Sequence, residues 1–119
     1  MTQPAKPRIQ FRMRIYRDGD IAVGPGKIAL LEAIVDAGSI TAAAQRMGMS
    51  YRRAWLLVDE LNRSLRRPAV ETAVGGARGG GTVVTDAGRE LIRRYRAVEA
   101  AAHEAAADDL SALKRMLAP

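Results

Sequence analysis

The chain has 119 residues, enough for one domain with a single hydrophobic core. It lacks cysteine, which excludes disulfides and thiolate metal sites, and its apolar runs are too short for a signal peptide or a membrane span, so we expect a cytoplasmic protein. The net charge of +6 lies entirely in residues 1–67, with 12 basic and 6 acidic residues, whereas residues 68–119 are neutral. This division indicates a polyanion partner for the first part of the chain.

The N-terminal region is predicted to be an arm followed by a strand. Residues 1–7 contain two prolines and no apolar pattern, which is typical of a flexible arm. Residues 8–16 alternate between apolar and polar side chains and predict a half-buried strand, and residues 21–23 predict the returning strand. Arginines on the polar side, at positions 8, 12 and 14, either contact nucleic acid or form a solvated strand face, and we favour the second interpretation.

Two helices are predicted next. Apolar residues follow helical spacing from Lys27 until Gly38, which ends the first helix. The second helix covers residues 41–47 and is nearly all alanine on its inner side, which allows a neighbouring helix to approach closely. Either Ser39 or Thr41 supplies its N-cap.

A third helix begins after Ser50 and is predicted to run to about Arg66, before Pro68. Its positions 54, 58, 61 and 65 form one narrow apolar stripe, which we expect to face the core. The first turn and a half then points outward, and it contains Tyr51, Arg52, Arg53, Trp55 and Leu56. Trp55 either packs between this helix and the next segment or contacts the partner directly.

Two short β-prone runs, residues 70–74 and 82–85, flank a glycine-rich stretch that carries one cation, Arg78. They predict a hairpin that follows the helix pair as a wing does in a winged helix. The glycines lack the Gly-Lys-Ser/Thr ending of a phosphate-binding loop, so we exclude nucleotide binding.

From Asp86, capped by Thr85, a long helix is predicted, with a possible break at 108–109. Its apolar seam is too long to be buried on so small a domain, so we expect it to contact a second copy of the chain. The seam contains Leu91, Tyr95, Val98, Ala102, Ala106, Leu110, Leu113 and Leu117. His103 is the single histidine and has no partners for a catalytic triad or a metal cluster, so we expect neither an enzyme nor a bound cofactor or metal.

Residues 38–50 resemble the helix-turn-helix of LysR-type regulators. The segments 27–31, 50–55 and above all 75–92 narrow the resemblance to the DNA-binding domain of ModE-type, molybdate-responsive regulators. The resemblance covers roughly residues 24–96. It implies a mainly α fold with small β structure: a winged helix-turn-helix over residues 8–85 and a dimerisation helix over 86–119. Longer members carry molybdate-binding domains after this part, for which the chain has no room, so we expect a single-domain member.

The resemblance implies a homodimeric transcriptional regulator that binds a palindromic operator in double-stranded DNA. The third helix would enter the major groove, and the wing would lie on the backbone or in the minor groove. Two alternatives stay open: a sensor that binds an oxyanion or metabolite at the dimer interface, and a non-specific architectural module. The predicted DNA contacts are Thr41, Ser50, Tyr51, Arg52, Arg53, Trp55, Leu56 and Arg78.

Overall fold

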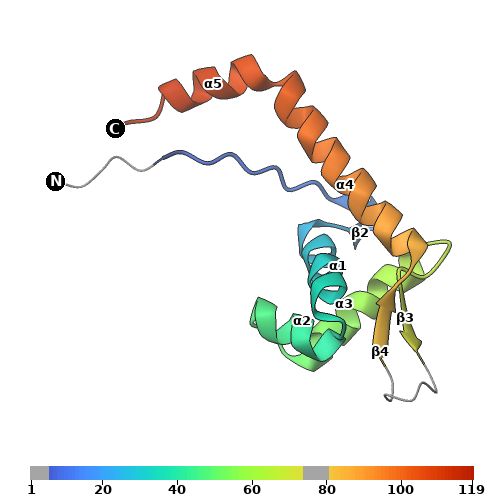
Figure 1. Cartoon of the computed structure of the whole chain (residues 1–119). Coiled ribbons are helices and arrows are strands. Elements are labelled where there is room, and N and C mark those ends of the chain that lie inside the picture. The colour runs from blue at the N-terminus through green and yellow to red at the C-terminus, as the bar shows by residue number, and fades with distance from the viewer. Residues whose placement is uncertain (1–5, 74–80) are drawn as a thin grey trace.

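The computed structural model describes residues 6–73 and 81–119, and these are mainly helical (Figure 1). The predicted class, a winged helix-turn-helix with small β structure and a C-terminal helical region, is confirmed. In chain order the elements are β1 (Ile15–Arg17), β2 (Asp20–Val23), α1 (Pro25–Ala37), α2 (Ile40–Met47), α3 (Tyr51–Ser64), β3 (Val70–Ala73), β4 (Gly81–Val84), α4 (Asp86–Ala105) and α5 (Ala107–Arg115).

The strand predicted over residues 8–16 is wrong for most of its length. Of residues 8–16, only Ile15 and Tyr16 lie in a strand, β1. This strand pairs antiparallel with β2, with an irregularity between Ile15 and Tyr16. Residues 6–14 are assigned to no strand. Beside the irregularity the expected alternation ends, and Ile15 is exposed instead of half-buried.

The alternation in residues 8–14 has a different cause. Ile9, Phe11 and Met13 are half-buried, and the residues between them are exposed. The Tyr95 hydroxyl of α4 donates to the Met13 carbonyl at 2.7 Å, and the Phe11 ring packs edge-on against His103 with centroids 4.7 Å apart. The segment therefore runs antiparallel to α4 (Figure 1), and a helix instead of a strand covers its apolar side.

Helices α1 and α2 form closely to the prediction. Helix α1 begins two residues earlier than expected, with Pro25 in its first turn, and ends at Gly38 in the left-handed conformation. The Ser39 hydroxyl accepts a hydrogen bond from the Ala42 amide at 3.1 Å, so Ser39 and not Thr41 caps α2.

The core lies between α1, α2 and α3. Its largest fully buried side chains are Ile28, Leu30, Leu31 and Ile34 of α1 and Leu61 of α3. Burial of each such side chain contributes roughly 1.5–3 kcal/mol. The small residues of α2 and α3 at this junction, Ala43, Ala44 and Ala54, are also buried, which agrees with the predicted close approach of the helices.

The predicted hairpin is present as the antiparallel pair β3–β4, in which Val70 lies opposite Val84 and Ala73 opposite Gly81. The residues between these strands, including Arg78, lie outside the described ranges. Helix α3 ends at Ser64, two residues before the predicted Arg66.

The long C-terminal helix is interrupted, but at Ala106 instead of 108–109. Ala106 leaves helical geometry (φ −103°, ψ 14°), and α5 starts in a new direction (Figure 1). Asp108 and Asp109 lie in the first turn of α5, where carboxylates stabilise the positive end of the helix dipole. The predicted acidic pair therefore starts the second helix instead of interrupting the first. Among the described helices, none is both long and apolar enough to cross a bilayer.

Candidate nucleic-acid interface

The turn between α2 and α3 determines where α3 begins. Gly48 has a left-handed backbone (φ 67°), which glycine adopts without strain, and its amide donates to the Gln45 carbonyl at 3.2 Å. The Ser50 hydroxyl then accepts from the Arg53 amide at 3.1 Å and caps α3, as predicted. The first helical residue is therefore Tyr51.

The register of α3 separates a buried stripe from an exposed one. Ala54, Val58 and Leu61 are buried, whereas Leu65, the last predicted member of the stripe, is half-buried and packs against the core. The expected outward orientation of the first turn and a half is confirmed, because all five side chains there are exposed: Tyr51, Arg52, Arg53, Trp55 and Leu56.

The two arginines at the start of α3 form no ion pair with any described residue. Further along the same helix the charges are paired, since Arg63 contacts Asp59 at 3.0 Å. Arg52 and Arg53 therefore leave two guanidinium groups available to an anionic partner. A planar guanidinium can bind a phosphate or a guanine edge through two hydrogen bonds.

Trp55 and Leu56 add an apolar surface to this charged turn, with 46% and 40% of each residue exposed. Trp55 is exposed, and the residues between β3 and β4, against which a wedge would pack, lie outside the described ranges. Thr41 is exposed at the start of α2. Position 78, predicted to contact the backbone, is not among the described residues.

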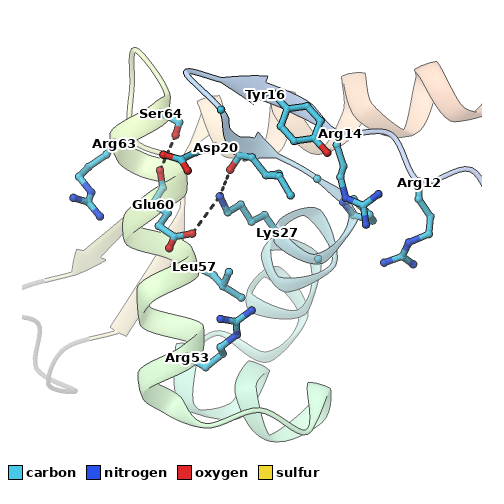
Figure 2. A pocket seen from close by; sticks show the side chains of 15 residues that line it. Arg12, Arg14, Tyr16, Asp20, Lys27, Arg53, Leu57, Glu60, Arg63 and Ser64 are labelled. Atoms are coloured by element: carbon cyan, nitrogen blue, oxygen red, sulfur yellow. Dashed lines mark hydrogen bonds and ion pairs between the residues drawn. The ribbon is translucent and has the colours of Figure 1, made fainter.

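Lys27 of α1 contacts both β2 and α3. The sequence pattern did not predict this role for Lys27. Its ammonium group donates to the Ile21 carbonyl at 2.6 Å and lies 3.4 Å from a Glu60 carboxylate oxygen of α3 (Figure 2). The side chain is buried, so these partners offset the cost of removing its charge from water. Lys27 thereby holds α3 against β2 and the start of α1.

Asn62 connects α3 to the first wing strand and was also missed. The side-chain amide nitrogen of Asn62 donates to the Val70 carbonyl at 3.0 Å. The side-chain carbonyl oxygen accepts from the backbone amides of Ala69 and Val70, at 2.8 and 3.3 Å. Its partners are backbone groups, so the sequence carries no pairing pattern that points to this role.

Replacing Asn62 with alanine is expected to lower the free energy of unfolding by about 1–3 kcal/mol, because backbone groups at the base of β3 lose their partners. Urea unfolding followed by circular dichroism measures this change. Arg63→Ala is the control, because that neighbour is exposed and its substitution should cost about 0.5 kcal/mol or less. Equal stability of the two variants would contradict the role of Asn62.

The predicted dimer seam divides into two parts along α4 and α5. Tyr95 is 2% exposed and Leu91 packs against the core, so both belong to the interior of the subunit. Burial and then the nearby Glu99 raise the pKa of the Tyr95 hydroxyl. The seam residues beyond them range from half-buried to exposed, with Val98, Leu113 and Leu117 the most exposed and Ala102, Ala106 and Leu110 half-buried.

Arg96 connects α4 to α1, a contact that the sequence pattern did not predict. Its guanidinium donates to both oxygens of Glu32, with Nε 3.1 Å from Oε2, and also to Glu99 at 2.6 Å. These hydrogen bonds raise the pKa of Arg96 further above its ordinary range. The contact links α4 to α1 on the exposed side of their junction.

A sequence model of the family described as bacterial regulatory helix-turn-helix proteins, lysR family, matches residues 26–89. The chain is 49% identical over 78 residues to the molybdenum-pterin-binding protein MopB of Rhodobacter capsulatus, covering 66% of this chain and 29% of that protein. It is 40% identical over 104 residues to the molybdenum transport protein ModE of Azotobacter vinelandii, covering 87% and 38%.

A third relative is the DNA-binding transcriptional dual regulator ModE of Escherichia coli K12, 38% identical over 87 residues, covering 73% of this chain and 31% of that protein. The chain thus spans about a third of the length of these relatives. The relatives named ModE are regulatory or transport-linked proteins, and the match includes the whole of α1 to β4 apart from one residue at the start of α1. The chain therefore belongs to the lysR family of bacterial regulatory helix-turn-helix proteins, as a ModE-like DNA-binding domain.

Proposed function

We propose that the chain is a homodimeric transcriptional regulator that binds a palindromic operator in double-stranded DNA. The start of α3, from Ser50 to Leu56, enters the major groove, and the wing lies on the flanking backbone or minor groove. The observation that carries this proposal is the exposed turn with two arginines unpaired among the described residues, on a helix whose opposite stripe is buried.

The experiment that tests sequence-specific binding is selection of bound fragments from genomic DNA, followed by footprinting and competition at fixed salt. A specific regulator is expected to prefer its selected site over random DNA by roughly 10³-fold or more. Equal competition by random DNA would instead support the architectural module. Thermal-shift measurements with molybdate and tungstate test the sensor alternative, and we expect no shift.

Exposed apolar side chains on α4 and α5 support the dimer. Val98 and Leu113 are 49% and 58% exposed, and Met116 and Leu117 extend this surface beyond the subunit core. Exposed apolar patches of this kind mark interaction sites, and a second copy of the chain would remove this surface from water. Two copies then present their α3 helices to half-sites about 34–36 Å apart.

Replacing Leu113 with aspartate is expected to raise the dimer dissociation constant on the order of 100-fold, because an unpaired carboxylate enters an apolar contact. Light scattering across a dilution series measures the change. The control is Ser111→Asp, which adds the same charge at an exposed polar position of α5. A dimer unaffected by Leu113→Asp would place the interface elsewhere.

A further inference from the structure

A groove of about 880 Å³ lies between the N-terminal segment, the start of α1 and the side of α3 (Figure 2). Its lining has five cationic side chains and two carboxylates. Figure 2 shows Arg12 and Arg14 on the N-terminal segment, across from Arg53 on α3. The groove therefore begins at the same turn that we propose to enter the major groove.

The cations of the groove differ in whether they are already paired. Lys27 binds Glu60 and the Ile21 carbonyl, and Arg63 binds Asp59. Arg12, Arg14 and Arg53 are exposed and form no ion pair with the described residues. These three side chains carry the charge that is available to a ligand.

The position of the unpaired charges favours a long polyanion over a small ion. Lys27, the buried cation of the groove, already contacts protein oxygens, and in the described residues no buried side-chain polar atom lacks a partner. An enclosed anion would find no unpaired donor at the floor. The available guanidinium groups lie on exposed side chains, where a phosphate chain that passes over the surface can reach them.

We propose that this groove is a second contact with the same DNA duplex, in which Arg12 and Arg14 bind backbone phosphates beside the half-site read by α3. The inference rests on the proposed function and extends it to the N-terminal segment. Arg12 and Arg14 are both exposed and both line the groove. Phosphate contacts of this kind fix the orientation of the protein on DNA without reading its sequence.

The test is the salt dependence of binding by the full chain with Arg12→Ala and Arg14→Ala combined. The slope of log K against log salt is expected to fall by roughly 1.8, at about 0.9 for each phosphate contact. Affinity at physiological salt should fall on the order of tenfold for the selected operator and for random duplex alike. Both side chains are exposed, so the thermal unfolding midpoint should stay unchanged.

The matched control is Lys6→Ala with Arg8→Ala, which removes two charges from the same segment outside the groove. An unchanged slope in the Arg12 and Arg14 variant overturns the inference, as does an equal loss in the control. A loss confined to the operator also overturns it, because that result indicates base contacts.

Two further outcomes separate this inference from the proposed function. If the wild-type chain selects no DNA, the proposed function fails, whereas normal operator binding with an unchanged slope in the groove variant defeats only the inference. Thermal shifts with inorganic phosphate in the absence of DNA form the last arm. A shift that depends on Arg12 and Arg14 at micromolar phosphate would identify a small-anion site and overturn the duplex contact.

Discussion

Replacing Arg52 and Arg53 together with alanine is expected to weaken operator binding by roughly 2–6 kcal/mol, at about 1–3 kcal/mol for each base-reading arginine. Both side chains are exposed, and the hydrogen bond that caps α3 uses the Arg53 backbone amide, which alanine retains. The dimer and the unfolding midpoint should therefore stay as in the wild type. Fluorescence anisotropy with the selected operator measures the loss, and light scattering measures the dimer.

The chain offers a matched control for this variant. Arg66 and Arg67 form a second exposed arginine pair just beyond the end of α3, so Arg66→Ala with Arg67→Ala removes the same charge. This control should reduce affinity much less and leave the footprint unchanged. If the Arg52 and Arg53 variant still protects the same site, or if both pairs weaken binding equally, α3 does not read the operator through its first turn.

Much of the helix-turn-helix was predictable because its determinants are local in sequence. Gly48 and Ser50 set the turn and the cap, and the spacing of Ala54, Val58 and Leu61 sets the buried side of α3. These effects involve residues within a few positions of one another. The exposure of the first turn of α3 followed directly from them.

The structure of residues 8–14 was not predictable in this way. Alternation of apolar and polar residues shows that one side of the segment is covered, but not which element covers it. In this chain α4, about 82 residues away, supplies the cover through Tyr95 and its bond to Met13. The contact of Arg96 was not predicted for the same reason, because its partner Glu32 is 64 residues away in the sequence. Lys27 and Asn62 escaped for a related reason, since their partners include backbone carbonyls, which carry no residue-specific pattern.

Replacing Gly88 with alanine is expected to lower the free energy of unfolding by about 1–3 kcal/mol or more. Gly88 lies in the first turn of α4, where a Cβ would clash with the Ala69 carbonyl oxygen and lie only 2.7 Å from a Val84 methyl group. That carbonyl cannot move freely, because it accepts the Thr85 amide at 2.9 Å. Thermal and urea unfolding measure the effect.

Gly26→Ala separates this clash from the general effect of replacing a helical glycine. Gly26 also lies in the first turn of a helix, but a Cβ there meets no atom within 4 Å. Alanine at this position should be neutral or stabilising by up to about 1 kcal/mol, since it is the better helix former. The opposite sign at Gly88 would then come from packing between α4 and the base of the wing. A Gly88→Ala protein as stable as Gly26→Ala would contradict this close packing between α4 and the base of the wing.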